Sequence, residues 1–147
     1  MCRFEDLMIV AIQDASHANA FDQSASGTRM GYRSQSGRVL CLTNKSFKNN
    51  KKGILLPVEW HSTVIKRVSR STLQSETLSL VLGSEEADHL RYVMHGLTNK
   101  LYKEPDFIAA LDSIDVMWVT DCFSLFEHIM RDCKTFRTNV WPLIFAV

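Results

Sequence analysis

The chain has 147 residues, of which 46% are hydrophobic and 22% are charged, and its formal net charge is +1. These values predict one soluble globular domain with enough apolar material for a core of two or three layers. They exclude a disordered or fibrous protein. No apolar run approaches the roughly 18 residues that a membrane span requires.

The charges are unevenly distributed along the chain. Between positions 29 and 70 the only acid is Glu59, and the basic residues there are Arg29, Arg33, Arg38, Lys45, Lys48, Lys51, Lys52, Lys66, Arg67 and Arg70. Such a stretch attracts a polyanion such as nucleic acid. A set of solvated loops is the alternative explanation of the same composition.

The cysteines and histidines indicate no metal or disulfide chemistry. No CxxC spacing occurs among Cys2, Cys41, Cys122 and Cys133, and no signal peptide precedes them. We therefore expect reduced thiols in an intracellular protein, cytoplasmic or nuclear. The five histidines lack the spacing of metal ligands, and we assign them no role.

The first regular element predicted along the chain is a buried strand. Leu7–Ile12 is a continuous apolar run, typical of a strand covered on both faces, and it ends at Gln13-Asp14. Residues 15–28 are rich in Ser, Ala, Asn and Gly, which predicts a loop, and Met30–Ser34 is compatible with an extended segment.

Two further strands are expected after a turn at Ser36-Gly37. Arg38–Thr43 is the return strand, and a polar turn then leads to a strand at Ile54–Trp60. Pro57 places this last strand at a sheet edge, because proline cannot donate to the strand ladder. The segments together predict a three-stranded antiparallel meander.

A long helix is predicted from Ser71, which forms a capping box with Gln74. Glu76 belongs to the apolar stripe that should lie on the sheet, and Gly83 would let the helix approach a strand closely. A favourable interaction with the helix dipole is the alternative reason for a glutamate here. The stripe consists of Leu73, Leu80, Ala87, Leu90, Met94, Leu97 and Leu101.

A second buried strand follows a polar connection around Lys103–Asp106. It comprises Ile114 and Val116–Val119 and ends in Thr120-Asp121. A helix over Ser124–Arg131 then has Leu125, Phe126 and Ile129 available for its inner face. A strand, a crossover helix and a second buried strand favour parallel pairing with a right-handed connection.

Three carboxylates stand out because each follows or interrupts apolar sequence. Asp14 and Asp121 end the two predicted central strands, and Glu76 lies in the apolar stripe of the helix. Burying a carboxylate costs free energy unless something compensates it, and a shared divalent metal would compensate all three. Parallel neighbours also end at the same sheet edge, where open α/β sheets bind ligands.

The order of these segments resembles ribonuclease H, and more narrowly the ribonuclease H domain of the reverse transcriptase polyprotein of LTR retrotransposons such as the copia group. The resemblance covers residues 6–131. The motifs that carry it are Asp14-Ala15-Ser16 with Asn19, Ser34-Gln35-Ser36-Gly37, Trp60-His61-Ser62, Arg70-Ser71-Thr72 before Ser75-Glu76-Thr77-Leu78, and Val119-Thr120-Asp121-Cys122-Phe123-Ser124-Leu125.

The resemblance implies hydrolysis of the RNA strand of an RNA–DNA hybrid by two Mg²⁺ ions, with Mn²⁺ as an alternative. Asp14, Glu76 and Asp121 match the family's catalytic, metal-binding carboxylates. An upstream reverse transcriptase domain of the same polyprotein would be a partner, and no membrane is involved. The residues expected to contact the hybrid are Arg38, Lys45, Lys48, Trp60, Lys66, Arg67 and Arg70.

The implied fold is a single ribonuclease H-like α/β domain over residues 1–147. Its mixed five-stranded sheet has a meander of strands 1–3, strand 4 parallel to strand 1, and flanking helices. The chain departs from the family after residue 131, since the tail 132–147 contains no acid beyond Asp132. We expect the last strand and helix, and a fourth metal ligand, to be missing.

The sequence has three alternative functional interpretations. A catalytically inactive remnant that binds nucleic acid would keep the basic surface alone. In the integrase and transposase branch of the fold the third acid follows the last strand, whereas Glu76 precedes strand 4. A nucleotide-binding Rossmann domain is disfavoured because no GxGxxG follows the first strand.

Overall fold

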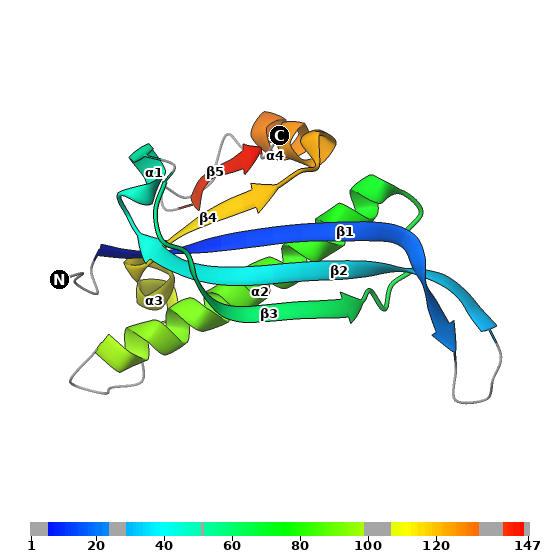
Figure 1. The fold of residues 1–147 in the computed structure, drawn as a ribbon, viewed down its shortest axis with the longest axis horizontal. Coiled ribbons are helices and arrows are strands. Elements are labelled where there is room, and N and C mark those ends of the chain that lie inside the picture. Colours follow the sequence, from blue (N-terminus) through cyan, green and yellow to red (C-terminus); the bar gives the residue numbers. More distant parts are fainter. Residues whose placement is uncertain (1–5, 24–28, 51, 99–106, 133–139, 146–147) are drawn as a thin grey trace.

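A computed structural model describes residues 6–23, 29–50, 52–98, 107–132 and 140–145 (Figure 1). The fold is α/β, with a mixed sheet flanked by helices. The elements are β1 (Leu7–Gln23), β2 (Arg29–Asn44), α1 (Phe47–Asn50), β3 (Leu56–Val64), α2 (Thr72–Thr98), α3 (Phe107–Ser113), β4 (Asp115–Thr120), α4 (Phe123–Asp132) and β5 (Val140–Phe145).

The strands β3, β2, β1 and β4 lie side by side in that order (Figure 1). β2 pairs antiparallel with both β1 and β3, and β1 pairs parallel with β4, with Ile12 opposite Val119. The predicted parallel pairing is confirmed. So is the edge position of the strand that contains Pro57, because β3 ends the sheet on that side.

The turn predicted at Ser36-Gly37 is wrong, because β2 runs through both residues. Ser36 pairs with Ala15 and Gly37 with Asp14, so β1 also continues through much of the predicted loop 15–28. Serine, alanine and glycine have weak strand preferences, but pairing with neighbouring strands on both sides of β2 overrides them. The expected meander therefore consists of β1, β2 and β3.

α2 crosses the sheet on one face, where it packs on β1 and β2 (Figure 1). Its first turn is capped, since Ser71 Oγ accepts the N–H of Gln74 at 3.2 Å. Gln74 Oε1 accepts the N–H of Arg70 at 2.7 Å, one residue before the position expected in a capping box. The helix start predicted at Ser71 is thus confirmed in a variant form.

The apolar stripe of α2 was only partly predicted. Ala87 and Met94 are buried in the core, whereas Leu97 is 79% exposed, and Leu101 lies outside the described residues. In the first half of the helix, the residues that face the sheet are small or polar: Ser75, Glu76, Ser79 and Gly83. These residues meet polar groups on β1 and β2, so the helix turns a polar surface to the sheet there.

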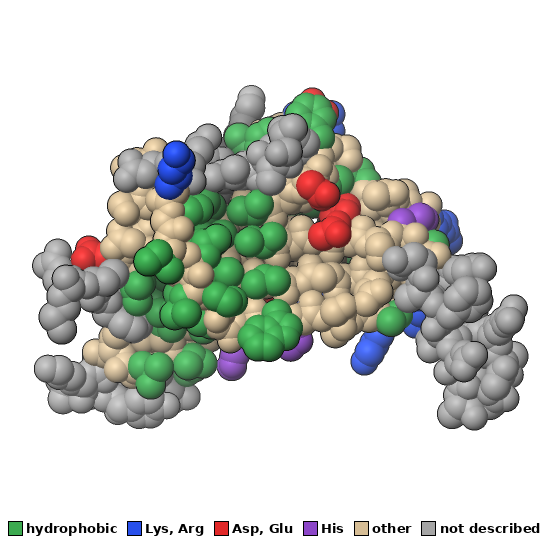
Figure 2. Space-filling view, in the orientation of Figure 1, with side chains coloured by type: hydrophobic (Ala, Val, Ile, Leu, Met, Phe, Trp, Pro, Cys, Tyr) green, Lys and Arg blue, Asp and Glu red, His purple; other side chains and the backbone are tan. Residues whose placement is uncertain are grey.

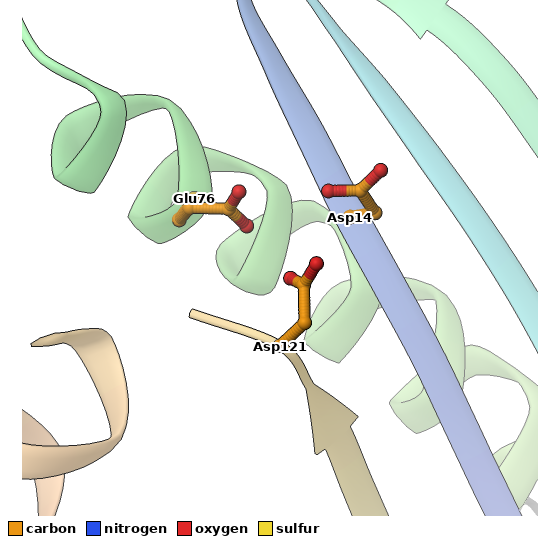
Figure 3. A group of neighbouring side chains, drawn as sticks. All are labelled: Asp14, Glu76 and Asp121. Carbon is orange, nitrogen blue, oxygen red and sulfur yellow. The ribbon is translucent and has the colours of Figure 1, made fainter. Parts of the chain in front are cut away.

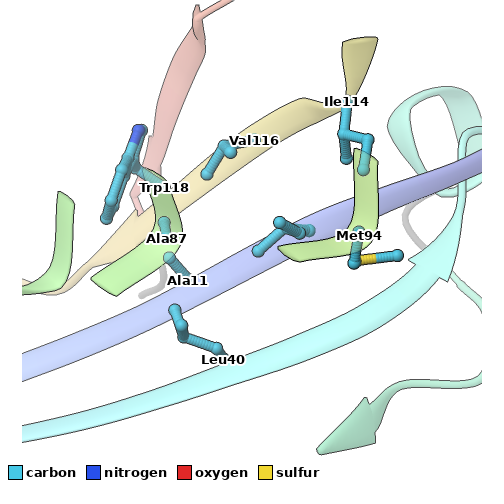
Figure 4. Packing of buried hydrophobic residues seen from close by; sticks show 8 residues of the cluster. Ala11, Leu40, Ala87, Met94, Ile114, Val116 and Trp118 are labelled. Atoms are coloured by element: carbon cyan, nitrogen blue, oxygen red, sulfur yellow. The ribbon is translucent and has the colours of Figure 1, made fainter. Parts of the chain in front are cut away.

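The main core lies between α2 and the sheet (Figure 4). Its buried members include Ile9, Ala11, Leu40, Val116 and Trp118, and Phe126 and Ile129 of α4 pack against it as predicted. A second cluster on the opposite face of the sheet contains Met8, Val10, Cys41 and Met117, covered in part by Phe47 and Leu55.

Gly83 allows α2 to lie close to the sheet, as predicted. A Cβ atom at this position would lie 3.0 Å from Gln13 Oε1 and 3.5 Å from the ring of Trp118. The distance to Gln13 is tighter than normal side-chain packing, whereas the distance to Trp118 is an ordinary van der Waals contact. The absent side chain thus sets the separation between the middle of the helix and the two central strands.

The segment after α4 differs from the expectation of a missing last strand. β5 pairs parallel with β4, with Val116 opposite Val140 and Thr120 opposite Phe145. The apolar tail had no period or turn signal that distinguished a strand from an irregular segment. Pairing with the otherwise free edge of β4 satisfies the backbone hydrogen-bonding groups of the tail.

Within the described residues, no helix has the length and apolarity to cross a membrane.

Candidate metal centre

Two of the three carboxylates are positioned by the parallel strand pair. The paired register of β1 and β4 ends at Ile12 and Val119, and Asp14 and Asp121 each lie two residues further along. β4 ends at Thr120, whereas β1 continues beside β2. Because the strands run in the same direction, both carboxylates lie just beyond the point where the pairing of β1 with β4 ends.

The third carboxylate comes from the second turn of α2. Glu76 is 3% exposed, and its Oε1 accepts the backbone N–H of Ala15 at 3.3 Å. Its Oε2 is buried without a hydrogen-bond partner among the described residues. An unpaired buried carboxylate oxygen is costly and points to a ligand or proton that the protein atoms do not supply.

The three side chains converge on one place (Figure 3). One carboxylate oxygen from each of Asp14, Glu76 and Asp121 lies within 4.8 Å of the others. Glu76 forms the buried floor, whereas Asp14 and Asp121 are exposed. In Figure 2 acidic side chains appear together on the surface near the middle of the view, so solvent and ligands have access to them.

The environment of Glu76 disfavours its negative charge. Burial, together with the charges of Asp14 and Asp121, raises the pKa of Glu76 to about 7, and the N–H bond from Ala15 opposes this shift. A carboxyl group with such a pKa ionises fully at neutral pH only when a cation neutralises the cluster.

The donor set fits a hard divalent cation. Mg²⁺ prefers oxygen ligands and is commonly held by a few carboxylates that leave other positions to water or substrate. Asp14, Glu76 and Asp121 supply carboxylate oxygens, and the unpartnered Oε2 of Glu76 is available as a ligand atom. Among the described residues no fourth carboxylate joins this group.

Contrary to the prediction, Arg38 does not lie on a nucleic-acid-binding surface. It is 6% exposed, and its guanidinium forms two hydrogen bonds with Glu86 of α2, Nε to Oε2 at 2.8 Å and Nη2 to Oε1 at 2.6 Å. The strand alternation turns Arg38 toward α2, where the acid neutralises its charge. A phosphate group therefore has no access to it.

Lys45 and Lys48 lie at the far end of the sheet from the carboxylates. Lys48 Nζ is 2.6 Å from Asp115 Oδ2, and Lys45 Nζ is 3.9 Å from the same oxygen. Leu7 of β1 pairs with Asn44 of β2. The seven residue-to-residue steps from Leu7 to Asp14 span about 23 Å of strand. These two lysines are thus removed from the candidate centre.

The other predicted nucleic-acid contacts are exposed. Trp60 is 72% exposed on β3, and Lys66, Arg67 and Arg70 are exposed in the connection from β3 to α2. The connection leads directly into the helix that carries Glu76, so these three charges lie at the carboxylate end of the sheet. The sequence alone did not distinguish them from Lys45 and Lys48.

A hydroxyl cluster beside the carboxylates was not predicted. His17 Nδ1 lies 3.1 Å from Ser75 Oγ, 3.3 Å from Ser69 Oγ and 3.4 Å from Ser34 Oγ. β1 has an irregular register between Ser16 and Ala20, which turns His17 toward the start of α2. Neither the spacing of these residues nor their composition signals the cluster in the sequence.

Comparison with known proteins leaves the family of this chain open, because no family model, curated protein or solved structure matches it.

Proposed function

We propose that this chain is a retrotransposon-derived, ribonuclease H-like domain that hydrolyses the RNA strand of RNA–DNA hybrids with divalent metal ions. The observation that carries the proposal is the convergence of Asp14, Glu76 and Asp121 within 4.8 Å. They come from three segments far apart in the sequence, so their meeting is a product of the fold.

The chain topology supports the same proposal. An antiparallel β1–β2–β3 meander, the crossover helix α2 and a strand β4 parallel to β1 form the arrangement that the resemblance to ribonuclease H implies. The carboxylates occupy the positions that the resemblance assigns to metal ligands. Glu76 precedes β4 in the chain, which separates this arrangement from the integrase order.

The three carboxylates would hold two Mg²⁺ ions, or Mn²⁺ in their place. When bound, such ions activate water and stabilise the charge on the leaving oxygen of a phosphodiester. The protein contributes the buried floor formed by Glu76 and the hydrogen bond from Ala15 N–H that orients it. Asp14 and Asp121 lie on the solvent side, where a phosphodiester would approach.

The exposed cations beside the centre would bind the hybrid. Lys66, Arg67 and Arg70 would contact phosphates, and Trp60 offers an exposed ring on the face of the sheet opposite α2. Phosphate contacts carry no sequence information, so we expect recognition by A-form shape and 2′-hydroxyl groups. Arg38, Lys45 and Lys48 are not included in this surface.

A labelled RNA–DNA hybrid tests the proposal directly. We expect the parent chain to cleave the RNA strand with Mg²⁺ or Mn²⁺ but not with EDTA, and Asp14→Asn to lose activity. Asp112→Asn is the matched control, because Asp112 is an exposed aspartate near the end of α3 outside the carboxylate group. Equal cleavage by the parent and Asp14→Asn would refute the site assignment.

The same assay separates the alternative function, a nucleic-acid-binding module without activity. The exposed cations of the β3–α2 connection support binding whether or not the carboxylates are active. Salt-sensitive binding of the hybrid without cleavage by any metal-loaded form would favour the module.

A further inference from the structure

The peptide bond between Asp14 and Ala15 is held by α2 through both of its polar atoms. Ser79 Oγ donates a hydrogen bond to the carbonyl oxygen of Asp14 at 3.3 Å, and the N–H of Ala15 donates to Glu76 Oε1 at 3.3 Å. Glu76 and Ser79 are three residues apart and so lie on one face of the helix. The backbone that carries Asp14 is thereby tied to the helix that carries Glu76.

The Ser79 hydroxyl is itself fixed by a chain of hydrogen bonds that begins at Arg38. Arg38 Nη1 donates to Ser36 Oγ at 2.8 Å, and Ser36 Oγ lies 2.6 Å from Ser79 Oγ. Both serines are fully buried at 0% exposure, so water does not compete for these bonds. At the other end, two hydrogen bonds to Glu86 anchor the guanidinium.

The donor and acceptor properties of the end groups determine the direction of this chain. A guanidinium only donates, and a backbone carbonyl only accepts. Ser36 therefore accepts from Arg38 and donates to Ser79, and Ser79 donates to the carbonyl of Asp14. With these donors and acceptors, the chain is a directional connection from Arg38 to the peptide of Asp14.

We propose that Arg38, Ser36 and Ser79 form a peptide clamp that positions the Asp14 carboxylate against Glu76 for metal binding. The proposal rests on the proposed function, and it gives Arg38 a positioning role in place of the predicted contact with nucleic acid. Groups that orient metal ligands affect metal affinity without touching the ion. The clamp acts through the main chain of Asp14, and none of its three side chains is a metal ligand.

The test of the positioning role is Mn²⁺ binding, measured from the electron paramagnetic resonance signal of free Mn²⁺. We expect Ser79→Ala to bind Mn²⁺ about tenfold more weakly than the parent, the magnitude typical of groups that support metal ligands. Ser84→Ala is the matched control, because within the described part of the chain the Ser84 hydroxyl bonds to Val81 O of its own helix α2. Unchanged Mn²⁺ affinity in Ser79→Ala, with loss in Asp14→Asn, would overturn the positioning role.

A metal-free measurement distinguishes failure of the clamp from failure of the metal centre. In EDTA, Ser79→Ala should speed amide hydrogen exchange at Ala15 roughly fivefold, the factor that corresponds to the net free energy of one hydrogen bond. The amide of Val10 in the middle of β1 is the internal reference, since a general loss of stability would affect both amides. Equal changes at Ala15 and Val10, or no change at either, would overturn the clamp.

A second variant avoids the half-buried, unpaired carboxylate of Glu86 that a single change at Arg38 would leave. Arg38→Met combined with Glu86→Gln removes both ions of the pair, and we expect the same selective acceleration at Ala15 and the same weaker Mn²⁺ binding. If the parent bound no Mn²⁺, the metal centre and the positioning role would both be refuted. The Ala15 exchange would then still decide whether the clamp itself exists.

Discussion

The protonation of Glu76 predicts how the stability of the metal-free protein depends on pH. Burial and the neighbouring aspartates raise the pKa of Glu76 from 4.5 to about 7. Between these pH values the folded state binds more protons than the unfolded state, so stability falls as pH rises through this window. Below this pH window Glu76 contributes fully to the free energy of unfolding, and above the window that contribution is lost.

The magnitude follows from the size of the shift. A change from 4.5 to about 7 corresponds to about 3 kcal/mol between the two limits. Glu76→Gln keeps the shape of the side chain and an acceptor for the N–H of Ala15 but cannot ionise. The variant should therefore lack this part of the pH dependence and be more stable than the parent at pH 8 in EDTA.

Urea unfolding of both proteins at pH 4 and pH 8 measures this difference. The buried ring of Trp118, which is 8% exposed, provides a fluorescence signal for unfolding. Addition of Mg²⁺ should restore stability to the parent at pH 8 and have little effect on Glu76→Gln, because binding to the folded state alone stabilises it. The same pH dependence in the two metal-free proteins would refute the environment assigned to Glu76.

Three further predictions concern the sheet, the helix and the basic connection. Arg38→Met should cost about 3 kcal/mol of unfolding free energy in urea titrations, because Glu86 loses its partner. Adding Glu86→Gln should recover most of this loss, and no recovery would contradict the role assigned to the Arg38–Glu86 ion pair. Gly83→Val should cost about 1–3 kcal/mol in the same assay because the helix must move off the sheet, whereas an unchanged midpoint would show that the contact yields freely. Lys66→Ala with Arg67→Ala should lower the slope of log affinity for the hybrid against log salt by the equivalent of about two phosphate contacts. An unchanged slope would place the hybrid elsewhere on the protein.

The site was predictable to the extent that each carboxylate marks the end of a local pattern. Asp14 and Asp121 follow apolar runs that form strands in this chain, and Glu76 stands five residues after a capping serine, Ser71. Strand ends and helix starts are encoded by nearby residues, which is why these positions were found. Their meeting within 4.8 Å required the parallel register of β1 and β4.

The exposure and the ion-pair partners of the basic residues were not predictable from composition. Arg38 alternates toward α2 and meets Glu86, which is 48 residues away in the sequence, and Lys48 meets Asp115, which is 67 residues away. Lys66 stays exposed. The sequence does not distinguish a basic residue that faces solvent from one that pairs with a distant acid, because only the fold places the two residues next to each other.

By itself, the sequence determined the central strands, the start of the long helix and the three acids, since apolar periodicity and capping act over a few residues. The tertiary structure alone decided that β2 passes without a turn through Ser36 and Gly37, that β5 pairs with β4, and that Arg38 supports Asp14 through Ser79. These features depend on pairing and burial between segments far apart in the chain. Such contacts exist only once the sheet and α2 have come together.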